Sequence, residues 1–250
     1  MAKAVADFLL YGLVGLFAQF ADGAMGMGYG VITNVFLLSL GVPPAAASAG
    51  VHAAKAPTTA LSGASHAWFG NVDWRLLWRL ALPGILGGLV GAAALVTLAG
   101  ETVRPFIAAY LLLMGLLILR RAWRADNAAE AAGRHLIPLG LGGGFLDAIG
   151  GGGWGPIVTS SLVAKGVQPR LAVGSVNLAE FFVTIGTATA LNLGIGDVPW
   201  GIIAGLVTGG LIAAPFAAYV SRHLPARPLM IAVGSGIILM SLRMIWLSLG

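Results

Sequence analysis

The stretch Asp22-Gly-Ala-Met-Gly-Met-Gly-Tyr-Gly30 interrupts an apolar part of the sequence, and a second copy, Asp147-Ala-Ile-Gly-Gly-Gly-Gly-Trp-Gly155, interrupts another half a chain later. Each copy begins with an aspartate and carries an aromatic residue beside its last glycine. So many glycines predict a backbone that turns sharply or adopts positive φ, and they leave room for another group to approach the main chain. Within a bilayer, such a charged break is tolerated only where it is buried in protein or lines a cavity. We therefore predict that the two breaks face each other and form a substrate site.

The composition is that of an integral membrane protein. Hydrophobic residues make up 58% of the chain, charged residues only 9%, and the mean hydropathy is +0.92. The absence of cysteine excludes disulfides, zinc–thiolate sites and thiol catalysis. The net charge of +5 does not indicate a nucleic-acid partner, because the basic residues lie in short loops between apolar segments, as the positive-inside rule predicts.

Ten apolar segments can be read from the sequence. In each half the first two are short, and the next three are long enough to cross about 30 Å of hydrocarbon. The segments are residues 5–20, 25–40, 45–69, 75–98 and 103–120, followed by 136–147, 153–165, 169–191, 199–219 and 226–248.

The two halves of the sequence repeat each other. Asp22 aligns with Asp147 without a gap, and the same alignment matches Gly26, Gly28, Gly30 and Pro44 to Gly151, Gly153, Gly155 and Pro169. We predict an all-α polytopic membrane protein of two inverted repeats, each a short Gly-rich broken helix pair followed by three transmembrane helices. The predicted units are residues 1–121, a cytoplasmic linker at 122–135, and residues 136–250. Whether the short pairs are re-entrant or fully spanning is left open.

The charge distribution predicts the orientation of these segments. With the arginine-rich linker in the cytoplasm, Arg75, Arg79 and Lys165 fall on the cytoplasmic side, whereas the loops at 98–103 and 193–199 fall outside. His66 and the loop at 70–75 are then expected at the cytoplasmic interface.

The third segment of each half carries unusual polar residues. His52-Ala-Ala-Lys55 aligns with Asn177-Leu-Ala-Glu180, and positions i and i+3 share a helix face. Lys55 and Glu180 could pair with each other, or with Asp147 and Asp22, and so lock the halves together. Alternatively, Lys55 and His52 could receive an anion together with the helix N-termini that follow the glycine turns.

The candidate site combines these positions. Residues expected to bind substrate are Lys55, His52, Asn177, Ser175, Thr58, Thr184, Gly26, Gly28, Tyr29, Gly152, Gly153 and Trp154. Asp22, Asp147 and Glu180 are expected to couple transport to protons, although each aspartate could instead cap the helix that follows its turn. No metal site or cofactor is expected.

In the order of these features the chain resembles the sulfite exporter TauE/SafE family of membrane transporters. The features are a Gly-rich break, an apolar run, a turn such as Gly41-Val42-Pro43, a small-residue third segment, the loop Gly-Asn-Val-Asp-Trp-Arg at 70–75, and their repetition. The resemblance implies proton-coupled secondary transport, usually export, of sulfite, sulfonates or thiosulfate across the bacterial cytoplasmic (inner) membrane. It also implies that a polar Asn–Lys pair of the third segment appears here as His52 with Lys55, while Glu180 replaces a basic residue.

Two other functions compete with this interpretation. An anion channel would have the same sequence features, and would differ by a very high flux uncoupled from pH. An intramembrane enzyme acting on a lipid-borne substrate is disfavoured, because the sequence lacks a His-Glu-x-x-His pair, a Gly-x-Ser-x-Gly turn and a phosphate-binding loop. The expected partners are a small anion and the lipid bilayer, and the Gly-rich faces could also serve a homodimer.

Overall fold

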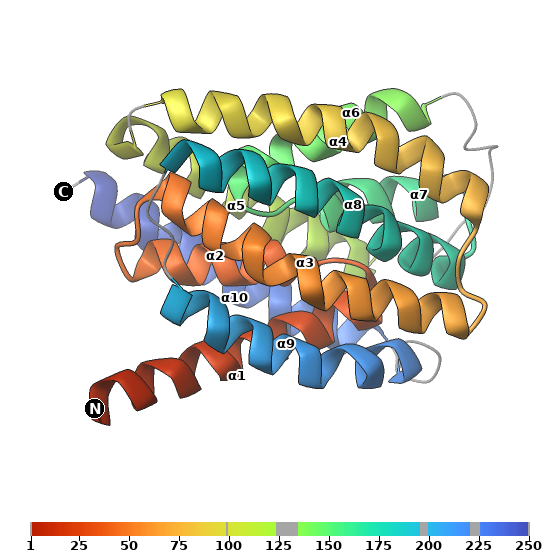
Figure 1. The fold of residues 1–250 in the computed structure, drawn as a ribbon, viewed down its shortest axis with the longest axis horizontal. Coiled ribbons are helices and arrows are strands. Elements are labelled where there is room, and N and C mark those ends of the chain that lie inside the picture. Colours follow the sequence, from red (N-terminus) through yellow and green to blue (C-terminus); the bar gives the residue numbers. More distant parts are fainter. Residues whose placement is uncertain (1, 99, 124–134, 196–199, 221–225, 250) are drawn as a thin grey trace.

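The structure is a computed structural model that describes residues 2–98, 100–123, 135–195, 200–220 and 226–249 (Figure 1). The predicted all-α polytopic fold is confirmed, and no strand occurs among the residues that the structure describes. The helices are α1 Ala2–Met25, α2 Tyr29–Ser39, α3 Pro44–Trp68, α4 Trp74–Thr97, α5 Gly100–Trp123, α6 Leu136–Gly150, the π-helix η2 Gly155–Thr159, α7 Ser160–Ala164, α8 Pro169–Ile195, α9 Trp200–Val220 and α10 Ala226–Leu249.

Five helices in the described part of the chain are long and apolar enough to cross a membrane. They are Val5–Met25, Trp74–Thr97, Thr102–Trp123, Pro169–Ile195 and Trp200–Ala217. The first segment was predicted to end at residue 20. That end is wrong, because α1 continues through Asp22 and breaks only at Gly26. The helix α3 is equally long but carries too many polar residues to count as an apolar span.

Local sequence explains where these helices begin and end. Asp73 caps α4 by accepting hydrogen bonds from the N–H groups of Arg75 and Leu76 at 2.9 and 3.1 Å. Gly26 and Gly151 end α1 and α6 with φ of 69° and 63°, a region that favours glycine. The predicted positive φ within both breaks is therefore present.

The helices lie side by side along the long axis of the molecule, with both chain ends at one end of the bundle (Figure 1). The central pair is α3 and α8, which pack against each other. On one side α4 packs on α8 and α6, and on the other α9 packs on α3 and α1, while α5 packs on α10. Each packing relationship therefore has a counterpart in which the two halves exchange roles.

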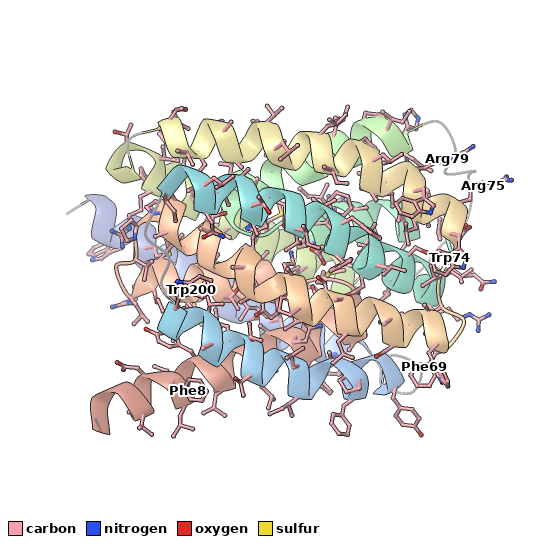
Figure 2. All side chains as sticks on the ribbon, in the orientation of Figure 1. Phe8, Phe69, Trp74, Arg75, Arg79 and Trp200 are labelled. Carbon is pink, nitrogen blue, oxygen red and sulfur yellow. The ribbon has the colours of Figure 1, made fainter. Side chains whose placement is uncertain are left out.

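The first residues of α4 and α9 lie at opposite ends of the bundle. Trp74, Arg75 and Arg79 lie at one end, as does Phe69, whereas Trp200 lies at the other (Figure 2). Inverted repeats require α4 and α9 to run in opposite directions. The inverted repeat itself and the boundaries of the two units remain predictions. The greater part of the predicted linker, residues 124–134, lies outside the described residues, as do residues 99 and 196–199 of the predicted external loops.

Close packing of the outer helix pairs depends on small residues. A Cβ added at Gly87 or Gly91 would collide with the backbone of α6, and one added at Gly205 or Gly209 would collide with that of α1. Without a hydrophobic driving force between helices in lipid, such close approach supplies the van der Waals contact that holds them together.

Candidate functional site

The two glycine-rich breaks meet in the interior. A Cβ at Gly30 would touch the backbone of Gly151 and Gly152, and one at Gly155 would touch that of Gly26 and Met27. Two hydrogen bonds tie the breaks further: Thr159 Oγ1 donates to the Gly26 carbonyl at 2.7 Å, and Asn34 Nδ2 donates to the Gly150 carbonyl at 2.5 Å. The breaks therefore face each other at a distance that only glycine permits.

Each break is bridged by its own aspartate. Oδ1 of Asp22 accepts a hydrogen bond from the N–H of Tyr29 at 3.3 Å, and Oδ1 of Asp147 accepts one from the N–H of Trp154 at 3.0 Å. Both aspartates lie in the last turn before the break, so their side chains hold the first N–H groups beyond it. This geometry supports the capping interpretation for both residues.

Lys55 joins the two halves through carboxylates. Its Nζ lies 3.5 Å from Asp147 Oδ1 on α6 and contacts Glu180 Oε1 on α8. The lysine is 2% exposed, and both carboxylates are equally buried. The geometry is that of the predicted ion pair between the halves, which places anionic oxygens directly on the Lys55 ammonium.

His52 is held between two acceptors. Its Nδ1 lies 2.8 Å from the carbonyl oxygen of Ser48, and its Nε2 lies 3.0 Å from Asp147 Oδ2. Each contact needs a hydrogen on the nitrogen, because a carbonyl and a carboxylate oxygen can only accept. His52 therefore links the Ser48 turn of α3 to Asp147 on α6.

Asp22, the aspartate of the first break, has no such partners among the described residues. Oδ2 of Asp22 is buried and has no hydrogen-bond partner in the described part of the chain, whereas the equivalent oxygen of Asp147 is held by His52. Lys55 lies within electrostatic range of Asp22, but Asp22 makes no ion pair among the described residues. The two equivalent aspartates thus have unequal surroundings.

Several other predicted residues join the cluster. Asn177 accepts a hydrogen bond from Ser62 at 3.2 Å, and Thr58 donates to the Lys55 carbonyl at 2.9 Å. Thr184 lies one turn beyond Glu180, and its buried hydroxyl has no partner in the described region. Tyr29 is buried with its hydroxyl beside Thr58. The backbone of Gly28, Gly152 and Gly153 forms the breaks themselves.

Two predicted residues lie elsewhere. Ser175 accepts a hydrogen bond from the N–H of Asp73 at 2.8 Å, which ties α8 to the loop before α4. The indole ring of Trp154 packs against Gly84 and Gly143, and its Nε1 donates to the Val176 carbonyl at 3.3 Å. The Trp154 ring thus belongs to the apolar core, although its backbone N–H stays in the cluster.

His66, which was expected at the cytoplasmic interface, lies in the last turn of α3. The side chain is fully buried, with Nε2 3.1 Å from the Gly23 carbonyl and Nδ1 3.3 Å from Asn71 Nδ2. His66 thereby ties the end of α3 to the turn of α1 that carries Asp22.

Gln19 is a candidate that the sequence reasoning missed. It lies one turn before Asp22, is fully buried, and neither amide atom has a hydrogen-bond partner among the described residues. Its side chain lies near Gly23 and Gly210, the latter also contacting Thr58. A lone glutamine in an apolar membrane segment is the signal that could have identified it.

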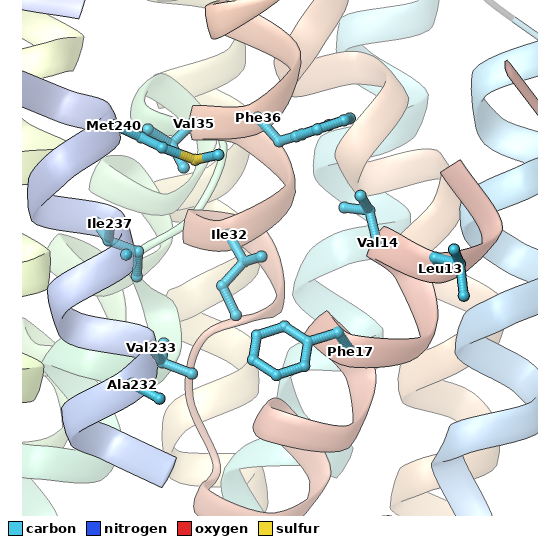
Figure 3. A pocket seen from close by; sticks show the side chains of 11 residues that line it. Leu13, Val14, Phe17, Ile32, Val35, Phe36, Ala232, Val233, Ile237 and Met240 are labelled. Atoms are coloured by element: carbon cyan, nitrogen blue, oxygen red, sulfur yellow. The ribbon is translucent and has the colours of Figure 1, made fainter. Parts of the chain in front are cut away.

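An apolar pocket of about 350 Å³ lies apart from this cluster, between α1, α2 and α10 (Figure 3). Its lining includes Leu13, Phe17, Ile32, Val233 and Met240. No charged side chain lines it, so it does not suit an anion.

The fold and the cluster define a multi-pass helical membrane protein with buried charges where two broken helices cross. The family model described as "Sulfite exporter TauE/SafE" matches residues 11–244. The chain belongs to the sulfite exporter TauE/SafE family. It is 41% identical over 247 residues to a "Probable membrane transporter protein YtnM" of Bacillus subtilis (strain 168), covering 94% of this chain and 81% of the relative. No solved structure matches this chain. The protein is thus a membrane transporter.

Proposed function

We propose that the protein is a secondary transporter that exports small sulfur-containing anions, such as sulfite or organosulfonates, across the bacterial cytoplasmic membrane. The observation that carries this proposal is the position of Lys55, which is buried inside the helical bundle and bridges Asp147 and Glu180 from the other half. An intramembrane cation is costly to bury and marks the pathway of a charged substrate. The family supplies the class of substrate.

The oxygen of Glu180 that contacts Lys55 marks where an anionic oxygen of the substrate would bind. Thr184 on the neighbouring turn, together with Asn177 and Thr58, supplies neutral hydrogen-bonding groups around that position. His52 holds the other oxygen of Asp147. Coupling to the proton gradient through Asp22, Asp147 or Glu180 completes the proposal.

Alternating access would arise from movement at the interface of the halves. The outer pairs α1–α9 and α4–α6 are packed closely through glycines and would move as units relative to α3 and α8. The burial of Lys55 and its partners favours a transporter with an occluded state over an open channel. A homodimer is part of the proposal and is testable by mass photometry.

Binding of anions to the purified protein tests this function. Thermal shift with sulfite, sulfate, thiosulfate, sulfoacetate, taurine and acetate should show selective stabilisation by a sulfur anion. That stabilisation should vanish in Lys55→Ala and persist in Lys165→Ala, a matched lysine variant in the turn after α7. Stabilisation by none of these anions would make Lys55 a structural ion-pair partner and would contradict the proposed site.

A further inference from the structure

We propose that Glu180 is the residue that carries the coupling proton, and that the substrate anion replaces its carboxylate on Lys55 when Glu180 is protonated. This inference rests on the proposed function and deepens it. From the sequence, Asp22, Asp147 and Glu180 were all expected to couple transport to protons. The structure gives these three buried carboxylates different surroundings, and we assign each a different role.

Asp147 is the fixed counter-ion of the site. Its two oxygens together face the N–H of Trp154, the imidazole of His52 and the ammonium of Lys55. Protonating this carboxylate would weaken three contacts at once, including the one that closes the second glycine-rich break. The arrangement therefore holds Asp147 in its ionised form throughout the cycle.

Asp22 is excluded as the carrier of the coupling proton for a different reason. Its Oδ1 is used by the N–H of Tyr29, and its Oδ2 has no hydrogen-bond partner in the residues described. Because Asp22 does not occupy the Lys55 ammonium, a proton on Asp22 frees no binding position. Protonation of Asp22 therefore cannot open a position for the substrate anion on Lys55.

Glu180 alone combines burial with a single, displaceable partner. Among the described residues, Lys55 is the one cation within ion-pairing distance of it. The ionisable groups near Glu180 are Lys55 and His52 on α3, Asp147 on α6 and Asp22 on α1. The packed segments η2 and α7 contribute none, and the ionisable residues of α4, Arg75 and Arg79, lie at the end of the bundle (Figure 2).

Charge balance then couples the two ligands. A proton from the aqueous face neutralises the Glu180 carboxylate, and one monovalent anion takes its place on the Lys55 ammonium. The buried site gains one positive and one negative charge, so its net charge does not change and no uncompensated charge is buried. The proton and the anion consequently travel in the same direction, and the sum of their gradients sets the direction of net flux.

Proteoliposomes containing the full-length protein test this with methanesulfonate, a fully ionised monovalent sulfonate. An inward methanesulfonate gradient should acidify the lumen of wild-type vesicles, as reported by internal pyranine. The apparent Kd for methanesulfonate should rise about tenfold for each unit by which the pH is raised, in the range where Glu180 must take up one proton before the anion binds. Glu180→Gln should keep exchange of labelled methanesulfonate, lose lumen acidification, and show a Kd independent of pH.

The other carboxylates provide the comparison. Asp147→Asn should lose exchange, Asp22→Asn should still couple exchange to acidification, and Asp7→Asn, outside the cluster, should behave as wild type. Wild-type exchange without acidification would overturn the inference and leave the proposed function standing. Uncoupling by Asp22→Asn rather than Glu180→Gln would also overturn it. If the wild type exchanges no methanesulfonate, the proposed function fails for sulfonates and the inference fails with it.

Discussion

Nε2 of His52 lies 3.0 Å from Oδ2 of Asp147, which joins α3 of the first half to α6 of the second inside the helical bundle. The same carboxylate receives the N–H of Trp154 at 3.0 Å, so one side chain fixes both the helix interface and the glycine-rich break. Asp22 holds its own break in the same way, but no cation of the described residues lies on its second oxygen. The two breaks therefore share the same backbone geometry, but their aspartates have different charged neighbours.

Asp147→Asn should destabilise the fold strongly. Replacement takes one of two carboxylates from the Lys55 ammonium and weakens the contact to the His52 ring, and breaking a buried pair costs about 3–5 kcal/mol. We expect a lower melting temperature in detergent by tryptophan fluorescence. The matched variant Asp22→Asn should have a much smaller effect, because Asp22 makes no ion pair among the described residues. An equal loss in both variants would contradict the unequal roles of the two aspartates.

His52→Gln should reduce stability less than Asp147→Asn does. A glutamine amide can still donate to Asp147 but loses the second contact of the ring, to the Ser48 carbonyl, and a hydrogen bond to a charged group contributes about 1.5–3 kcal/mol. We expect a measurable fall in melting temperature and weaker stabilisation by sulfur anions in the same thermal-shift assay. Unchanged stability together with unchanged anion binding would show that the His52 ring is not needed.

Two glycines of α6 test the helix packing. A Cβ at Gly144 would collide with the Gly84 carbonyl on α4, whereas nothing lies within 4 Å of one at Gly142. Gly144→Ala should therefore destabilise the protein by about 1–3 kcal/mol through overpacking, and Gly142→Ala should be tolerated. Expression level and melting temperature of the two variants are the measurement. Equal tolerance would mean that α4 and α6 do not pack as described.

Hydrophobicity and glycine content were sufficient to predict the helical segments, because lipid allows a spanning backbone few other conformations. The pairing of Lys55 with Glu180 was one of the alternatives that their equivalent positions in a repeated sequence allowed. The burial of His66 and the core position of the Trp154 ring could not be read in the same way. They depend on how α3 and α4 are rotated against their neighbours, and neither residue's own segment contains that information. The length of α1 was underestimated because Asp22 and Gly23 are poor helix formers that tertiary packing overrides.

Gln19 offers a test that separates stability from transport. Its amide is fully buried on α1, one turn before Asp22, with no hydrogen-bond partner in the part of the chain that the structure describes. An unsatisfied buried polar group costs about 1–3 kcal/mol, so Gln19→Leu, which keeps a similar volume and removes the polar atoms, should raise the melting temperature.

The same variant should impair transport if the amide is reserved for the substrate, since a polar group retained at a cost to stability is expected at a functional site. Gln19→Leu should therefore be more stable and yet bind sulfur anions less tightly in the thermal-shift assay. Leu13→Gln, on an exposed position of the same helix, serves as the control for composition. If Gln19→Leu gains stability and binds anions as well as the wild type, the glutamine lies outside the substrate path, and the binding site is confined to Lys55 and the side chains of α3 and α8 around it.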